Sequence, residues 1–320
     1  MLGSFVLLTA CGGGDGASDM SSPPSPAPAA PAKVTLAPGN YQNAVKLSMG
    51  VAATGYQYSK LAIGITDRWL GVPITFFPLI ACPDGGTMSV ELTDKNADHS
   101  LDPSDTIHFH WDRCRIQGTT TTGVVRVEVR EATAISGGRD YLLTVTVADL
   151  EIARDGLPAT TVNFISQVHY THTGTFDRCE VSNAVFSSGQ VVNDPGTSTL
   201  NIDYRQDLST QTYQYAVGGT VSSAAMGGEL EFSTPTAFSG VIGEYPSAGR
   251  LLVLGNAGSG ARLAEEGAAA GNPSTVLVDL DANGDGMVDA SEAQLAWSGV
   301  VPVQLFAAFP DQVAVAVPMP

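Results

Sequence analysis

Val124-Val-Arg-Val-Glu-Val-Arg130 alternates apolar and charged residues along its whole length. Successive side chains of a β-strand point to opposite faces, so this period of two puts the valines on one face and the charges on the other. One face then packs on a core and the other meets water, as in antiparallel sheets. The stretch therefore predicts a half-buried antiparallel strand.

The same pattern extends in both directions along the chain. Residues 87–93, 141–147, 199–204 and 212–217 alternate similarly, whereas residues 250–254 and 275–280 are more continuously apolar. Gly-rich and Asp-rich turns separate these segments, and no strong helical periodicity competes. We predict an all-β protein whose antiparallel meander forms a curved sheet, half-barrel or sandwich. Residues 261–270 are either a short helix or a strand end followed by a loop.

Asp281-Ala-Asn-Gly-Asp-Gly-Met-Val-Asp-Ala-Ser-Glu292 fits the twelve-position calcium loop of an EF-hand. Calcium takes six to eight oxygen ligands, and a short loop supplies them from alternate residues around a sharp turn. The expected ligands are Asp281, Asn283, Asp285, the carbonyl of Met287, Asp289 and Glu292. Gly286 stands at the turn position, which requires positive φ, and Val288 at position 8 is expected to pack under the loop.

The alternative for this segment is an Asn- and Gly-rich hairpin turn that holds no metal. A strand rather than a helix is predicted before the loop, over residues 275–280, and residues 290–297 are either a short helix or a return strand. Without a paired helical domain, Ca²⁺ would have a structural role rather than a sensing role.

A weaker version of the loop pattern occupies residues 94–105. Asp94, Asn96, Asp98 and Asp105 are its candidate ligands, together with Asp102 at position 9, and Leu101 stands at position 8. The turn position holds His99 instead of Gly, and Asp replaces the final Glu. The sequence therefore favours a polar loop without metal here.

The chain is strongly acidic, with 32 Asp and Glu against 15 Lys and Arg and a formal charge of −17. This balance argues against binding to nucleic acids and to anionic lipid headgroups. The sequence contains no nucleophile elbow, no zinc-protease motif and no phosphate-binding loop, so no catalytic residue is assigned. No apolar stretch is long enough to span a bilayer.

Two segments share the pattern aromatic-Asp-Arg-Cys, Trp111-Asp-Arg-Cys114 and Phe176-Asp-Arg-Cys179. A duplicated β unit explains them, with two similar strand ends as the alternative. In an oxidising compartment two of the three cysteines after residue 11 are expected to pair. Cys82 with Cys114 is favoured because they are closest in sequence, and Cys82 with Cys179 is the rival.

Leu8-Thr9-Ala10-Cys11 resembles the lipobox of bacterial lipoproteins, which implies lipidation of Cys11 and removal of residues 1–10 as the remnant of a signal peptide. Only ten residues precede Cys11, and none is Lys or Arg. Either translation begins further upstream or this segment is not a signal. Residues 11–34 follow as a Gly-, Pro- and Ser-rich tether. Gly12 after the cysteine implies, by the same resemblance, sorting to the outer membrane.

The chain as a whole resembles uncharacterised β-rich lipoproteins of Gram-negative bacteria. The residues that carry this resemblance are Cys11, the segment Cys82-Pro-Asp-Gly-Gly86, the two aromatic-Asp-Arg-Cys motifs, residues 276–286 and Trp297. We expect two β regions, residues 35–193 with the repeated motif and residues 194–320 with the calcium loop, or one continuous sheet.

The expected function is that of a non-enzymatic envelope lipoprotein with structural calcium. Its partner would be a glycan, a lipid or a protein. The alternatives are an envelope hydrolase whose carboxylates meet only in the fold, and a lipid carrier with an apolar cavity.

Overall fold

The computed structural model describes residues 32–70, 79–116, 118–135, 137–155, 159–189, 195–264, 275–289, 293–307 and 309. All of them belong to one compact unit, Pro31–Pro320. The segments predicted as signal remnant, Cys11 and most of the tether lie outside the described residues, as do Glu292 and residues 193–194 at the expected boundary. No helix within the described ranges is both long and apolar enough to cross a membrane.

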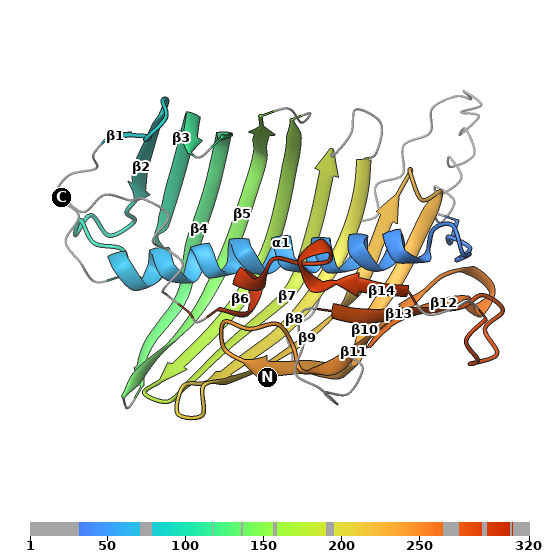
Figure 1. Ribbon diagram of the computed structural model, residues 1–320. Coiled ribbons are helices and arrows are strands. Elements are labelled where there is room, and N and C mark those ends of the chain that lie inside the picture. The colour runs from blue at the N-terminus through green and yellow to red at the C-terminus, as the bar shows by residue number, and fades with distance from the viewer. Residues whose placement is uncertain are drawn as a thin grey trace, which may run out of the picture. The chain divides into compact units, whose positions relative to one another are not determined.

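One long helix precedes a sheet in which every strand pairs with its neighbours in sequence (Figure 1). The elements are α1 (Tyr41–Trp69), β1 (Ile80–Ala81), β2 (Thr87–Thr93), β3 (Thr106–Ile116), β4 (Thr119–Ile135), β5 (Gly138–Arg154), β6 (Thr160–Thr173), β7 (Phe176–Gly189), β8 (Pro195–Asp207), β9 (Thr212–Ser223), β10 (Gly228–Val241), β11 (Ala248–Leu254), η1 (Asn256–Gly258), β12 (Gly260–Ala264), β13 (Thr275–Asp281), β14 (Ala293–Ala296), η2 (Trp297–Gly299) and η3 (Val303–Phe306).

The sheet is a 14-stranded antiparallel meander that does not close, and the predicted all-β curved sheet is confirmed. Its strands β7 and β8 pair from Phe176↔Asp207 to Gly189↔Pro195, across the expected boundary between the two β regions. Residues 261–264 of the ambiguous segment 261–270 belong to strand β12, as the strand alternative predicted. Residues 265–270 lie outside the described residues.

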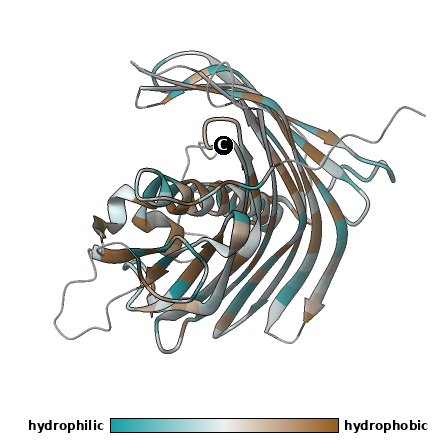
Figure 2. Cartoon of the chain, turned by 90° about the vertical axis from the view of Figure 1, so that its right-hand side faces the viewer, coloured by the Kyte–Doolittle hydropathy of each residue, from teal (hydrophilic) through white to brown (hydrophobic). Residues whose placement is uncertain are grey.

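The sheet curves, and α1 lies along its concave face (Figure 2). The buried residues alternate along the strands, as in the valines of β4 at 125, 127 and 129, each fully buried. These side chains lie on the buried face of the sheet, and the more polar side chains between them lie on the other face. The core of the protein is therefore the layer between α1 and the concave face.

Helix α1 is the element that the strand pattern does not predict. Most of its 29 residues are buried, so it has no broad polar face. Ser48, Ser59 and Thr66 are buried, and each donates its hydroxyl to the carbonyl four residues earlier at 2.9 Å. At Gly55 an added Cβ would lie 2.3 Å from Leu200 of β8, so glycine permits this close approach of helix and sheet.

Candidate functional site

The loop at residues 281–292 connects β13 to β14, and a strand flanks it on each side. The strand predicted over 275–280 is confirmed as β13, and of the two readings for 290–297 the return strand is present as β14. Asp281 accepts hydrogen bonds from the N–H of Gly284 at 2.7 Å and of Gly286 at 2.8 Å. Both glycines have positive φ, +77° and +86°, which is the left-handed turn expected at position 6.

The middle of this loop repeats the same type of bond. Asn283 Oδ1 accepts the N–H of Asp285 at 2.8 Å, and Asp285 Oδ1 accepts the N–H of Met287 at 2.8 Å. Asp289 Oδ2 accepts the N–H of Ala282 at 2.7 Å. The candidate side chains are thus gathered around one turn and offer only oxygen ligands, the kind that calcium prefers. Glu292, the expected bidentate ligand, lies outside the described residues.

The loop at residues 94–105, between β2 and β3, has the same turn. Asp94 at position 1 accepts the N–H of Ala97 at 2.6 Å and of His99 at 2.7 Å, which are positions 4 and 6. Ala97 and His99 have φ of +60° and +65°, although neither is glycine. The side chains of Asp94 and Asp281 therefore make equivalent contacts.

The equivalence extends to positions 3, 5 and 7. Asn96 Oδ1 accepts the N–H of Asp98 at 3.1 Å, and Asp98 Oδ1 accepts the N–H of Ser100 at 2.8 Å. Asn96 Nδ2 also donates to Asp98 Oδ2 at 3.1 Å, as Asn283 Nδ2 does to Asp285 Oδ2 at 3.1 Å. The sequence ranked this loop as the weaker candidate, but its hydrogen bonds follow the same pattern.

The two loops differ at their later positions. Asp105 at position 12 of the first loop is only 1% exposed, and it accepts the N–H of Lys95 at 2.8 Å and of Asp102 at 3.2 Å. Asp102 accepts Asn96 Nδ2 at 2.8 Å. Burial, opposed by that Asn96 bond and reinforced by the neighbouring carboxylates of Asp105 and Asp98, raises the pKa of Asp102. A nearby cation would offset this repulsion.

Position 8 also separates the loops. Leu101 is fully buried and forms a bridge with Leu70, next to the end of α1. Val288 at the same position of the second loop is 45% exposed, so the prediction that it packs under the loop is wrong. The second loop instead contacts the turn at Gly258, whose backbone would be 2.9 Å from a Cβ on Gly284. Arg262, paired with Asp279 at 3.1 Å, lies beneath it and reaches the Gly286 carbonyl at 3.4 Å.

The described residues contain no group of three or more His, Cys, Asp or Glu side chains placed to hold one metal ion. The loops lie on opposite ends of the strands, because β2–β3 and β13–β14 are connected at opposite ends of the meander. They also lie near opposite edges of the sheet (Figure 1). Loop 281–292 closes the hairpin at one edge of the sheet, and loop 94–105 closes the hairpin next to the two-residue edge strand β1.

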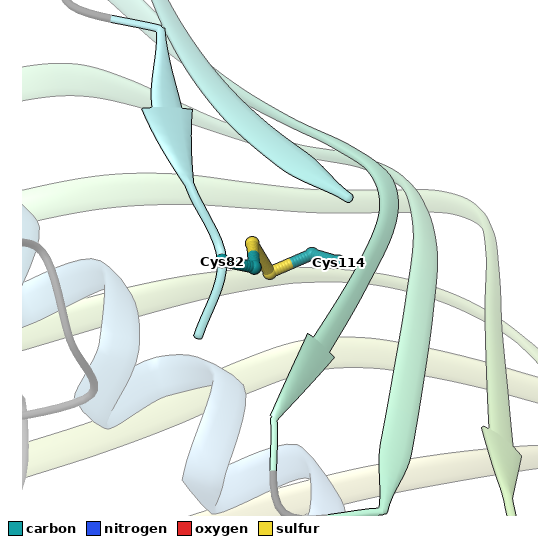
Figure 3. The surroundings of a disulfide bond; sticks show 2 residues. All are labelled: Cys82 and Cys114. Atoms are coloured by element: carbon teal, nitrogen blue, oxygen red, sulfur yellow. A yellow bond between two sulfur atoms is a disulfide. The ribbon is translucent and has the colours of Figure 1, made fainter. Parts of the chain in front are cut away.

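Two of the cysteines lie near the edge of the sheet formed by β1. Cys82, just after β1, and Cys114 of β3 form a disulfide with a Cα–Cα distance of 5.4 Å (Figure 3). This is the pair favoured from the sequence, and Cys179 is a buried free thiol. Because Cys82 precedes β2 and Cys114 lies in β3, the disulfide adds a covalent link across the hairpin that carries loop 94–105.

The two aromatic-Asp-Arg-Cys motifs occupy different ends of their strands. The first lies late in β3 and the second at the start of β7. Asp112 and Arg113 are exposed and contact only each other among the ion pairs of the described residues. Arg178 instead bridges Glu180 at 2.7 Å and Asp203 of β8 at 3.1 Å, and so ties two strands together.

Asp177 of the second motif belongs to a titratable cluster that the sequence did not reveal. It is 2% exposed and accepts hydrogen bonds from Tyr170 at 2.9 Å and from Nδ1 of His172 at 2.5 Å. Beside them, Arg139 of β5 pairs with Asp67 near the end of α1 at 2.8 Å. Arg139 and His172 are direct cross-strand partners, so two inward carboxylates share one end of the concave face.

Asp67 of this cluster has a raised pKa. Burial raises the pKa of Asp67, although Arg139 and Tyr141 oppose the shift. Oδ1 of Asp67 and Nε of Arg139 are buried, and neither has a hydrogen-bond partner within the described residues. No sequence pattern could have found this cluster, since its members come from α1, β5, β6 and β7 and meet only when the sheet forms.

Comparison of the chain with models of protein families, with curated proteins and with solved structures finds no match.

Proposed function

We propose that the protein is a non-enzymatic lipoprotein of the bacterial cell envelope with a binding or scaffold role, and that Ca²⁺ at the two acidic loops stabilises its curved sheet. The observation that carries this proposal is the shared hydrogen-bond pattern of residues 94–105 and 281–289. Asp94, Asn96 and Asp98 correspond to Asp281, Asn283 and Asp285 in both spacing and contacts.

The position of the loops supports a structural role for the ion. Strand β14 is an edge strand, and the outer neighbour of β2 is only the two-residue strand β1, so both hairpins are expected to open more readily than central strands. Calcium bound at each loop would hold the first and last turns of its hairpin together. Ligands at positions 1, 3, 5, 9 and 12 would come from both ends of each loop, with Met287 adding a carbonyl in the second.

The test is a thermal melt of the purified protein in EDTA and in millimolar CaCl₂, with MgCl₂ as the control. At a concentration of free Ca²⁺ about 100 times the dissociation constant, binding at each loop adds roughly 2.7 kcal/mol to the free energy of unfolding. We expect Tm to rise with calcium, and the shift to disappear in the double variant Asp94→Ala, Asp281→Ala. An unchanged Tm in the wild type would contradict the proposal.

The anchoring part of the proposal rests on Cys11 and the tether of residues 11–34, which lead into the described unit. Metabolic labelling with a radioactive fatty acid tests it, provided that expression starts far enough upstream to include a complete signal. The wild-type chain should incorporate label and fractionate with the outer membrane, whereas Cys11→Ser should do neither. Label that persists in the Cys11→Ser variant would refute lipidation at this residue.

Among the possible ligand classes, lipid carriage within the sheet is the least supported. Helix α1 occupies the concave face and buries Tyr56, Ile63 and Ile65 against it. A packed core of this kind supports an adhesion or scaffold role more than the transport of a lipid. A glycan or a protein partner remains part of the proposal.

The cluster around Asp177 supports a second candidate, an envelope hydrolase. Asp177 orients His172 through Nδ1, the arrangement in which a carboxylate positions a general base. His172 is 26% exposed, so its ring is reachable from solvent. A screen of ester, amide and glycoside substrates tests this candidate. Turnover that is lost in both His172→Ala and Asp177→Asn would favour it, and turnover unaffected by either change would exclude these residues.

A further inference from the structure

The C-terminal strap, defined here as Val303–Phe306 with Ala307 and Phe309, lies against one end of the concave face. The Gly243 N–H donates to the Phe306 carbonyl at 2.9 Å. The Ala307 carbonyl accepts two bonds, from Lys60 Nζ at 2.8 Å and from Gln206 Nε2 at 3.1 Å. The Phe309 N–H donates to Gln206 Oε1 at 3.2 Å. Most of these contacts therefore converge on two buried side chains.

The strap places two phenyl rings, Phe306 and Phe309, in a cluster of buried tyrosines. This cluster, with Lys60 and Gln206, is called the aromatic seat here, and its rings are Tyr56, Tyr170, Tyr204, Tyr213 and Tyr215. The Phe309 ring centroid lies 5.3 Å from that of Tyr170, 5.6 Å from Tyr204 and 5.9 Å from Tyr56. Phe306 stacks on Tyr213 at 5.0 Å. Ring contacts of this kind bind apolar groups without selecting one particular chemical identity.

Lys60 is the unusual member of this seat. It is 8% exposed, and no carboxylate within the described residues lies at salt-bridge distance from it. Its ammonium lies 5.3 Å from the Tyr56 ring centroid and 5.1 Å from that of Phe309. Burial lowers the pKa of Lys60 to about 8, so the group is mostly charged at neutral pH. A buried cation that is paired only with a neutral carbonyl and two rings is costly.

A second buried donor in the same seat lacks a partner. Tyr215 is fully buried, and its hydroxyl makes no hydrogen bond within the described part of the chain. Its ring lies 6.0 Å from that of Tyr204 and 6.1 Å from that of Phe306. The seat therefore offers more hydrogen-bond donors and more positive charge than the strap uses.

We propose that this seat is a binding site for a small apolar carboxylate, which displaces the strap. Its aromatic or aliphatic body would take the place of the Phe309 ring, and its carboxylate would take the place of the Ala307 carbonyl at Lys60 and Gln206. The exchange replaces a neutral acceptor with an anion, and a charge-assisted hydrogen bond is about twice as strong as a neutral one. This ligand class rests on the binding role proposed above, but not on calcium or on the lipid anchor.

The test uses two probes with the same phenylpropyl body and different ends, 4-phenylbutyrate with a charged carboxylate and 4-phenylbutanol with a neutral hydroxymethyl group, with the full chain in CaCl₂. We expect calorimetry to show that the acid binds about tenfold or more tightly than the alcohol. Hydrogen exchange of the peptide covering the strap should accelerate when the acid is added. The variant Lys60→Met should bind both probes equally, whereas Ser59→Ala, a buried neighbour bonded within α1 to the Gly55 carbonyl, should behave as wild type.

Equal binding of the two probes by the wild type, or unchanged exchange of the strap, would overturn the proposal. Should Lys60→Met fail to fold, amine acetylation of the wild-type protein gives an independent measurement. The acid should slow acetylation of Lys60 and the alcohol should not, and equal rates would refute the site. A calcium-induced rise in Tm that persists alongside a negative result would separate failure of this site from failure of the calcium proposal.

Discussion

The loops at 94–105 and 281–292 have the same turn but are held in it by different forces. In the second loop, Gly284 and Gly286 adopt positive φ at little cost, so the local sequence favours the turn. In the first loop, Ala97 and His99 adopt positive φ, and buried Leu101 and Asp105 hold the chain in place. The comparison teaches that one turn conformation arises either from local sequence or from tertiary packing.

The largest expected effect concerns the carboxylate that closes each loop. Asp105→Ala leaves two backbone N–H groups without their charged acceptor at a buried position, so it should lower the free energy of unfolding by about 3 kcal/mol. Asp289→Ala, at an exposed position, should cost about 1 kcal/mol. Urea unfolding in EDTA measures both. Equal losses would show that burial does not distinguish the loops.

The next largest effect on the free energy of unfolding is expected at position 4 of the loops, which is Ala97 in the first loop and Gly284 in the second. Gly284→Ala creates the residue type found at position 97, but its Cβ would meet the Gly258 backbone at 2.9 Å. Steric overlap together with left-handed strain should cost about 2 kcal/mol. Gly286→Ala, with open space around its Cβ, is the matched control and should cost about 1 kcal/mol. A loss at Gly284 no larger than at Gly286 would argue against this contact between the two turns.

Exchanging the turn residues tests whether the loops are equivalent. His99→Gly relieves a positive φ of +65° and should raise the free energy of unfolding by up to about 1 kcal/mol. Gly286→His should lower it by a similar amount. Melts in EDTA give the effect on stability, and calcium titrations show whether glycine strengthens binding at residues 94–105. A destabilising His99→Gly would mean that the histidine side chain has a role of its own.

The smallest effect is the pH dependence of Asp102. Its pKa is raised in the folded protein, so the folded state binds the proton more tightly than the unfolded state does. In EDTA the contribution of Asp102 to stability should therefore grow as the pH falls through its folded-state pKa and fade as the pH rises. Asp102→Asn should flatten this part of the curve. NMR titration of the Asp102 carboxyl carbon checks the direction, and bound calcium should lower the pKa.

Much of the sheet could be predicted from the sequence because strand pairing in a meander is local. The alternation at 124–130 and 141–147 reports which face is buried, and the turns between strands are short. Helix α1 could not be predicted in this way. It is enclosed by the sheet, so residues such as Ser48 and Lys60 lie inside and no broad polar stripe marks the helical period.

The candidate sites likewise differ in whether their residues are close together in the sequence. The loop at 281–292 was recognisable because its ligands and its glycines are consecutive in the chain. The turn at 94–105 could not be predicted in the same way, since the sequence does not show that His99 can be held at positive φ. The Asp67, His172 and Asp177 cluster and the seat around Lys60 had no sequence signal, because their residues are brought together from distant segments.

By itself the sequence determined the strands, the turns and the spacing of the acidic side chains in the two loops, all of which depend on residues close together in the chain. The tertiary structure alone decided that α1 occupies the concave face, that residues 94–99 adopt the same turn as residues 281–286 without glycine, and that Lys60 is buried with no carboxylate of the described residues at salt-bridge distance. These outcomes depend on burial and on contacts between distant segments, which the order of residues along one strand does not encode.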